Sequence, residues 1–298
     1  MTKRLPLLFA VLGIILRIVP VWHGSTWYDE NFSILLARLP IDRLLAATAG
    51  DVHPPLWYLL CWPLAHIPSI PGWTIVRLPS VLASIAALWV WWKILQQLEI
   101  SPQVRLVPFA LFCLLPQQIY YAQEGRMYAL LTLLVLTAWL CILRRQWVWL
   151  AVAITAMLYL QNYALFYAAS LWLAGMVYDR KTWKALTLAF FCAGIAYIPW
   201  LIVLLKQMSM IHGSYWMITI SLPSVLADLA HSVFIVIRLS SEMIIIAVFY
   251  GVLTWVLIWS LRNHHLNLPA LILAILPVTM AAIVSVVWQP IMLARALI

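Results

Sequence analysis

Long apolar runs, separated by short polar clusters, recur from one end of the chain to the other. A helix of about 20 apolar residues is long enough to cross the ~30 Å hydrocarbon core of a bilayer. The runs here are of about that length and continuous. The pattern predicts an all-α polytopic membrane protein that forms a single transmembrane domain over residues 1–298.

We expect about nine transmembrane helices, with further helices lying along the extracytoplasmic surface. The crossings are predicted at 5–22, 73–95, 106–120, 127–143, two within 147–178 with a turn near Gln161 and Asn162, then 185–204, 242–260 and 267–287. Lys and Arg gather at cytoplasmic helix ends. The basic clusters at 3–4, 144–145 and 180–184 therefore place the N-terminus in the cytoplasm, and we expect the first run to be a retained anchor in a cell membrane.

Three further stretches are not expected to cross. Residues 31–50 have helical apolar spacing, with Arg38 and Arg43 on the polar side, which predicts a helix lying on the membrane. Residues 54–71 contain five prolines, which leave only short helical pieces and predict a juxtamembrane or re-entrant segment. Residues 222–238 are amphipathic and are expected on the outer surface. Residues 23–72 thus form an extracytoplasmic loop with juxtamembrane helices.

Composition narrows the possible partners. Hydrophobic residues make up 66% of the chain and charged residues 9%, too few polar residues to cover the surface of a soluble domain. The net charge of +9 comes from small clusters at helix ends, so we expect a lipid bilayer as partner and no nucleic acid. The four cysteines lie singly in apolar stretches and show no metal-binding spacing.

The few acids are concentrated on one side of the predicted membrane. Of nine Asp and Glu residues, seven fall on or near the outer face: Asp29, Glu30, Asp42, Asp51, Glu124, Asp228 and Glu242. Polar loops alone could account for this bias, but Asp29 and Glu30 stand among Trp27, Tyr28 and Phe32. A carboxylate in an aromatic, low-dielectric setting is suited to act as a general base, so either acid is a candidate catalytic residue, with the other holding it or a cation.

Asp51 and His53 precede Pro54 and Pro55, which favour an extended backbone and would turn both side chains to one side. A metal ion, a proton relay or a diphosphate contact would each use such a pair, and Asp51 could instead start a helix. Two ligands do not define a metal site, so a divalent cation stays open and no other cofactor is indicated.

Three arginines lie at predicted membrane depth. Arg77 and Arg126 are expected at outer helix ends, where they could reach the water layer or hold a lipid-linked phosphate. Arg17, inside the first helix, is expected to be paired or to face a phosphate. His212, Tyr215 and Trp216 are candidates for sugar stacking.

Several short motifs resemble those of one known group. They are an aromatic-Asp-Glu triplet after the first helix, Asp-x-His-Pro-Pro-Leu-x-Tyr at 51–58, "RLPS" at 77–80 and, more loosely, "RMYAL" at 126–130. This set resembles the GT-C membrane glycosyltransferases, in particular glycosyltransferase family 39 and the dolichyl-phosphate-mannose protein mannosyltransferases. The likeness covers about residues 1–130.

The resemblance implies a polyprenyl-phosphate-linked sugar donor and inverting transfer to a lipid, glycan or protein acceptor on the outer face. It implies Asp29 as general base with Glu30 supporting it. It further implies that Asp51, His53, Arg77, Glu124, Arg126 and Tyr128 line the substrate site, with both arginines near the lipid phosphate. Members of this group are usually longer, and "PIMLARALI" at the C-terminus resembles a helix start, so we expect a C-terminally truncated chain.

Two other functions remain open from sequence. A polytopic transporter or lipid flippase predicts internal repeats and broken helices with charges at the membrane midplane. An inactive, truncated paralogue would keep the fold without the activity.

Overall fold

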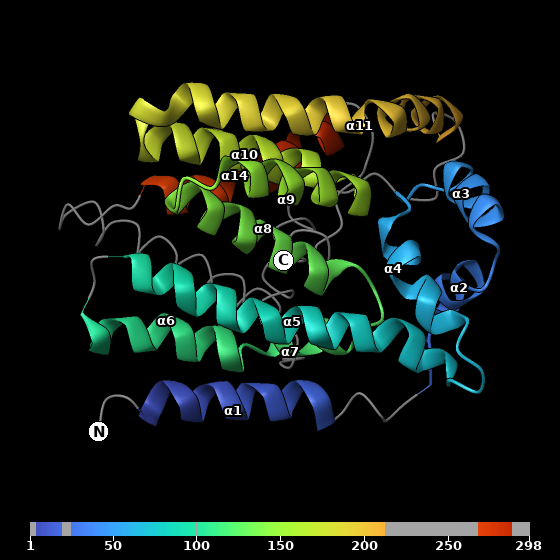
Figure 1. Ribbon diagram of the computed structural model, residues 1–298, viewed down its shortest axis with the longest axis horizontal. Helices are drawn as coiled ribbons and strands as arrows, with labels where there is room; N and C mark the ends of the chain where they lie inside the picture. The colour runs from blue at the N-terminus through green and yellow to red at the C-terminus, as the bar shows by residue number, and fades with distance from the viewer. Residues whose placement is uncertain (1–3, 20–24, 99–100, 212–267, 288–298) are drawn as a thin grey trace.

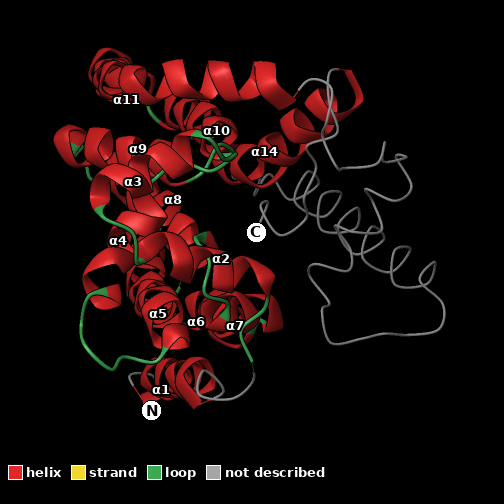
Figure 2. Ribbon diagram, turned by 90° about the vertical axis from the view of Figure 1, so that its right-hand side faces the viewer, coloured by secondary structure: helices red, strands yellow, loops and turns green. Residues whose placement is uncertain are grey.

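The computed structural model describes residues 4–19, 25–98, 101–211 and 268–287, and all regular structure within these ranges is helical (Figures 1 and 2). The longer helices are α1 (Arg4–Ile18), α5 (Gly72–Gln97), α6 (Pro102–Leu114), α8 (Tyr128–Leu143), α9 (Trp147–Leu160), α10 (Ala164–Tyr178), α11 (Trp183–Ile211) and α14 (Leu268–Val287). The shorter ones are α2 (Tyr28–Ala37), α3 (Ile41–Ala49), α4 (Leu56–Ala65), α7 (Pro116–Gln123) and the 3₁₀ turn η2 (Arg180–Thr182).

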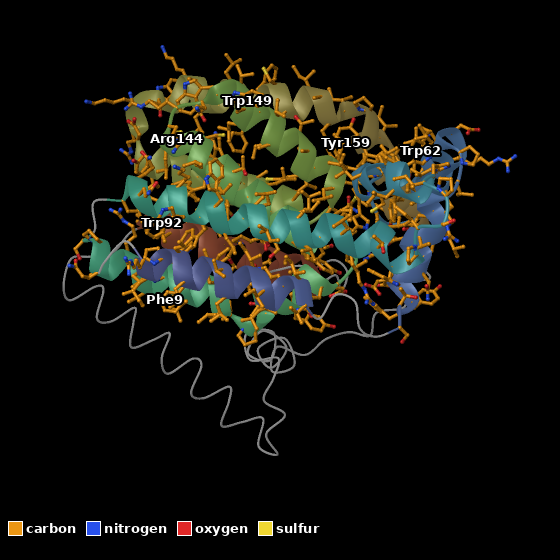
Figure 3. All side chains as sticks on the ribbon, turned by 60° about the horizontal axis from the view of Figure 1, so that its bottom comes forward. Phe9, Trp62, Trp92, Arg144, Trp149 and Tyr159 are labelled. Atoms are coloured by element: carbon orange, nitrogen blue, oxygen red, sulfur yellow. The ribbon has the colours of Figure 1, made fainter. Side chains whose placement is uncertain are left out.

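The long helices lie side by side, and α2, α3 and α4 gather at one end of the bundle, forming what we call the end layer (Figure 1). Arg144, which follows α8, lies at the opposite end of the bundle from Trp62 on α4 (Figure 3). The basic cluster and the juxtamembrane helices therefore lie at opposite ends of the bundle, and the side of the membrane on which each lies stays a prediction. Near the basic end, Arg145 donates to Asp179 at 2.7 Å, joining two loops predicted on the same side.

The described helices indicate a membrane protein. Three of them, α5, α11 and α14, are long and apolar enough to cross a bilayer, and α7 with α8 would make a fourth if that bent pair counts as one span. Exposed Leu, Ile, Val and Trp side chains cover the outside of the bundle, as expected of a lipid-facing surface. The number of nine crossings is not confirmed. Helices α4, α6, α9 and α10 are apolar but of only 10–17 residues.

Two predicted continuous helices are broken at prolines. The run predicted to cross at 106–120 is split into α6 and α7 at Leu115, and α7 meets α8 at a bend of 119°. Pro116 has no N–H to donate to the carbonyl of Phe112, so α6 ends there. The helix predicted over 31–50 is likewise two helices, because Pro40 separates α2 from α3.

Arg17 of α1 satisfies the carbonyls freed at the end of α6. It is fully buried, and it donates to the carbonyl oxygens of Cys113 and Phe112 at 2.8 and 3.2 Å and to Ser84 Oγ at 2.8 Å. A cation at a helix C-terminus also interacts favourably with the helix dipole. Of the two roles expected for Arg17, the structure thus shows the paired one.

Other predicted elements lie where expected. The segment 54–71 contains only the short helix α4, and α9 and α10 are joined by a turn at Gln161–Tyr163. Helix α14 matches the crossing predicted at 267–287. The expectations for 222–238, for the crossing at 242–260, for His212, Tyr215 and Trp216 and for the last eleven residues lie outside the described residues.

Candidate functional site

The two neighbouring acids lie in the first turn of α2, not on an irregular loop. Glu30 is buried, with 1% of its surface exposed, and it accepts two hydrogen bonds from Arg77 of α5, Nε to Oε1 and Nη2 to Oε2, both at 2.8 Å. The backbone N–H of Gly125 donates to the same Oε1 at 2.7 Å. Such a two-pronged pair is the geometry for which the guanidinium group is suited. Glu30 thus joins α2, α5 and the α7–α8 bend.

Arg77 is an ion-pair partner of Glu30 in this structure. It is 7% exposed, and its Nη2 also donates to the carbonyl of Ser25 at 3.1 Å. Its assignment to a lipid phosphate stays a prediction, and this geometry gives that assignment no support.

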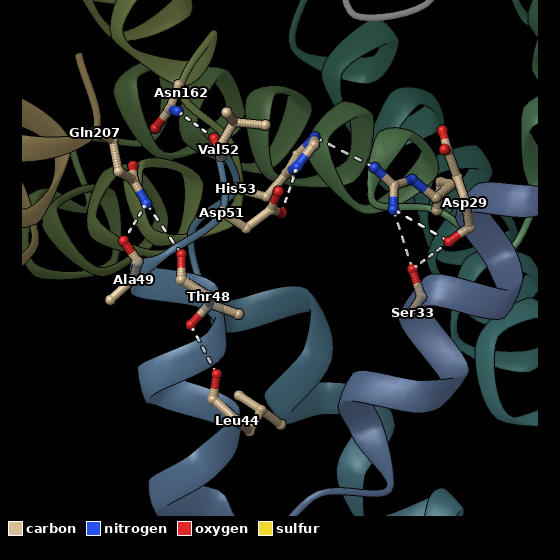
Figure 4. Close-up of polar contacts among 11 residues, drawn as sticks. Asp29, Ser33, Leu44, Thr48, Ala49, Asp51, Val52, His53, Asn162 and Gln207 are labelled. Carbon is tan, nitrogen blue, oxygen red and sulfur yellow. Dashed lines mark hydrogen bonds and ion pairs between the residues drawn. The ribbon is translucent and has the colours of Figure 1, made fainter. Parts of the chain in front are cut away.

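Arg126, in the α7–α8 bend, links α2 to the segment before α4. It is 2% exposed. Its Nη1 donates to Ser33 Oγ at 3.1 Å and to the backbone carbonyl of Asp29 at 3.4 Å, and its Nη2 lies 3.3 Å from His53 Nε2 (Figure 4). All three of these acceptors are neutral groups, so the positive charge is held in place without a directly bonded carboxylate among them. The charges that act on this guanidinium include the nearby carboxylate of Asp29.

His53 and Asp51 form a hydrogen-bonded pair next to this guanidinium. His53 Nδ1 lies 3.2 Å from Asp51 Oδ2, with 28% and 26% of the two side chains exposed. A carboxylate can only accept and a guanidinium can only donate, so the proton is on Nδ1 and the lone pair on Nε2 faces Arg126. The sequence expectation that both side chains turn to one side is confirmed. Asp51 starts no helix, because α4 is preceded by Pro55.

The pKa values of this pair are both displaced downward. Burial lowers the pKa of His53, the positive Arg126 lowers it further, and the bond to Asp51 opposes the change without reversing it. Burial raises the pKa of Asp51, but the hydrogen bond and charge of His53, a backbone bond and Arg126 outweigh it, and the pKa is lowered. Near neutral pH, His53 is thus neutral and Asp51 is ionised.

The remaining predicted residues border the same cluster. Asp29 is half-buried at the start of α2, and its charge acts on the guanidinium of Arg126, which bonds its backbone carbonyl. Tyr128 opens α8, is 4% exposed, and packs edge-on against Tyr121. Glu124 is 7% exposed and ends α7. Tyr58 of α4, fully buried, interacts electrostatically with Arg126.

No group of three or more His, Cys, Asp or Glu side chains suited to a metal ion occurs among the described residues. The pair Asp51–His53 offers two ligands, and the lone pair of His53 already faces a cation. This geometry gives no support to a divalent cation held by these two residues.

Sequence reasoning missed four contributors to the site: Ser33, Gly125, Asn162 and Gln207. Asn162 donates to the carbonyl of Val52 at 2.8 Å, and Gln207 donates to the carbonyls of Thr48 and Ala49 at 3.0 and 3.3 Å (Figure 4). For Asn162 and Gln207, the one signal available in the sequence was an isolated amide within or beside an apolar run.

Comparisons with known proteins identify no family for this chain. No protein-family model matches the chain, and no significant match was found among curated proteins or among solved structures.

Proposed function

We propose that the protein is an integral-membrane glycosyltransferase that moves a sugar from a polyprenyl-phosphate donor to an acceptor hydroxyl on the extracytoplasmic face, with inversion. The observation that supports this best is the meeting of Asp29, the Asp51–His53 pair and Arg126 at one end of an apolar helix bundle. Transfer from a phosphate leaving group needs a base for the acceptor and a cation for the phosphate, and this cluster offers both.

Asp29 is the better candidate for the base of the two neighbouring acids. Both carboxylate oxygens of Glu30 are engaged by Arg77 and the backbone, inside the protein. Asp29 is more exposed and lies at the rim of the same cluster. In the proposed step, Asp29 takes the hydroxyl proton while the acceptor oxygen bonds to the anomeric carbon. The bond from that carbon to the phosphate oxygen breaks, and the phosphate leaves with the electron pair from the opposite side.

Arg126 is the candidate partner of the departing phosphate. Its guanidinium is already oriented by Ser33 and the Asp29 carbonyl, so binding an anion would cost little further ordering. A charged, preoriented donor in a water-poor site stabilises developing negative charge strongly. Asp51 and His53 would then form the adjoining wall of the donor or acceptor site.

Transfer of a labelled sugar tests the proposal. Membranes carrying the protein are incubated with a radiolabelled polyprenyl-phosphate sugar, and transfer to endogenous acceptors is followed for wild type and for Asp29→Asn. We expect the substitution to lower the rate about 10²–10⁴-fold, the usual contribution of a general base. The matched control is Asp42→Asn, which changes an exposed acid in the first turn of the neighbouring helix α3 and should leave the rate unchanged. Equal transfer by wild type and Asp29→Asn would remove Asp29 as the base.

One observation favours a second candidate, a transporter or lipid flippase. The 119° bend between α7 and α8, with a buried arginine at the break, is the type of broken helix that forms ion or substrate sites in transporters. In that case wild type would form no transfer product, and reconstituted vesicles would move a lipid-linked phosphate or a small anion across the bilayer in an Arg126-dependent way.

A further inference from the structure

The segment from Thr48 to His53 carries the Asp51–His53 pair, yet it has little regular structure of its own. It begins with the last two residues of α3 and continues through four residues without helical or strand structure. Within the stretch, His53 bonds Asp51 and the backbone N–H of Asp51 donates to the carbonyl of Thr48 at 3.3 Å, but neither contact joins the segment to the rest of the molecule. Its position must therefore come from contacts with other parts of the molecule.

Two amide side chains from distant parts of the chain supply those contacts. Gln207, near the end of α11, donates to the carbonyls of Thr48 and Ala49, 159 and 158 residues away in sequence. These two carbonyls are among the last four of α3, which have no partner within the helix, although that of Thr48 also accepts from the backbone N–H of Asp51 at 3.3 Å. Asn162, in the turn between α9 and α10, donates to the carbonyl of Val52, 110 residues away. Asp51 is thus held from both sides.

In both amides, the NH₂ group is the part that bonds the segment. Gln207 is 2% exposed. The oxygen atoms Gln207 Oε1 and Asn162 Oδ1 are both buried and meet no donor among the described residues. An apolar side chain of similar size would remove this unbonded side-chain oxygen, but it would also take the amide donor away from the backbone carbonyls. Retaining an amide there is explained if its N–H group has to hold a carbonyl.

We propose that Gln207 and Asn162 are positioning residues that set the orientation of His53 and Asp51 relative to Arg126. The amides fix the backbone on the two sides of Asp51. Arg126, which comes from the α7–α8 bend, then lies next to His53 Nε2. The charged or titratable groups that act on His53 are Asp51 on its own segment, Asp29 of α2 and Arg126 of the α7–α8 bend. Because this inference concerns the orientation of the proposed catalytic site, its role in transfer rests on the proposed function.

Histidine NMR tests the placement without relying on activity. The protein is labelled with ¹⁵N-histidine, reconstituted in lipid and examined by solid-state NMR, and the signal of His53 is identified by its loss in His53→Gln. We expect wild type to show a neutral ring protonated at Nδ1. Gln207→Met and Asn162→Leu each remove one donor, and each should give a mixture of tautomers together with a higher pKa of His53.

The control is Trp62→Phe, which removes a similar hydrogen bond from another place in the end layer. Trp62 Nε1 donates to the carbonyl of Leu39 at 3.0 Å, outside the segment 48–53. This variant should leave the signal of His53 unchanged. An unchanged His53 tautomer in both amide variants would overturn the proposal. Failure of both to fold would also overturn it, because the amides would then serve the stability of the bundle.

Transfer kinetics provide the second measurement. If the glycosyltransferase proposal holds, each amide variant should lower kcat by about tenfold or more, since small displacements of positioned groups have large effects on rate. Trp62→Phe should retain the wild-type kcat. Should wild type show no transfer at all, the proposed function fails, whereas the NMR measurement still decides whether the amides position His53.

Discussion

Neutralising Asp29 and neutralising Glu30 are expected to have different effects on the protein, and Glu30→Gln is the more informative substitution. The glutamine keeps the shape of the side chain but removes its charge. Arg77, 7% exposed, would then lie buried without the carboxylate that now binds it through two hydrogen bonds of 2.8 Å. The NH₂ group of the glutamine, itself a donor, would also face an N–H donor of Arg77 or Gly125.

The size of the effect follows from this loss of pairing. Removing one partner of a buried ion pair costs about 3–5 kcal/mol, because the other charge is left uncompensated. We therefore expect Glu30→Gln to unfold at markedly lower temperature, and Asp29→Asn, which leaves this pair intact, to unfold close to the wild-type temperature. Replacing the pair with uncharged side chains, as in Glu30→Gln with Arg77→Met, should recover much of the lost stability.

Thermal stability in detergent measures these differences. Purified variants are heated in steps, and the folded fraction is read from the monodisperse peak on size-exclusion chromatography. Variants that remain folded are then compared for sugar transfer. The reasoning would be refuted if Glu30→Gln were as stable as wild type, or if the double variant were less stable than the single one.

Two further predictions concern Gly125 and His53. A Cβ added at Gly125 would collide with Val76 Cγ2 and lie 2.9 Å from Glu30 Oε1, so Gly125→Ala should destabilise by about 1–3 kcal/mol from overcrowding alone. Gly194→Ala in α11, where the added Cβ meets nothing within 4 Å, is the matched control, and stability at or above wild type is expected for it. The pKa of His53 lies below its ordinary value of 6.5 in the folded protein, so between that value and the folded pKa the unfolded chain binds more protons. The contribution of His53 to the free energy of unfolding should therefore be fully present above about pH 6.5 and should be lost as the pH falls from that value through the folded pKa. The loss of stability over this range should be smaller in His53→Gln. A steeper loss in the variant would contradict the assignment of a neutral His53.

The hydropathy pattern predicted two of the long apolar helices closely. Helix α5 was expected at 73–95 and runs over Gly72–Gln97, and α14 was expected at 267–287 and runs over Leu268–Val287. The pattern could not predict that α6 ends at Leu114. Apolar spacing continues across Pro116, and the break becomes stable because Arg17, 95 residues from Phe112, bonds the carbonyl that the proline leaves free.

Candidate site residues were recognisable as residue types, but their partners were not. An Asp-Glu pair among aromatics, and a His before two prolines, stand out in a chain with so few charges. That Glu30 binds Arg77 depends on how α2 packs against α5, 47 residues further along. The roles of Asn162 and Gln207 depend on which carbonyls end α3, which no spacing in the sequence reveals.

The division of roles between Asp29 and Glu30 follows from their place on a helix. Successive residues on an α-helix point about 100° apart around the axis, so two adjacent acids cannot face the same neighbour. Because Glu30 faces the interior and anchors α2 to α5, it fixes how α2 is rotated about its axis. That rotation leaves Asp29 half-buried, with its backbone carbonyl 3.4 Å from Arg126 Nη1. A buried ion pair formed by one acid thus determines where the other acid lies. Under the proposed function, both acids are then needed for transfer, although only Asp29 meets the acceptor.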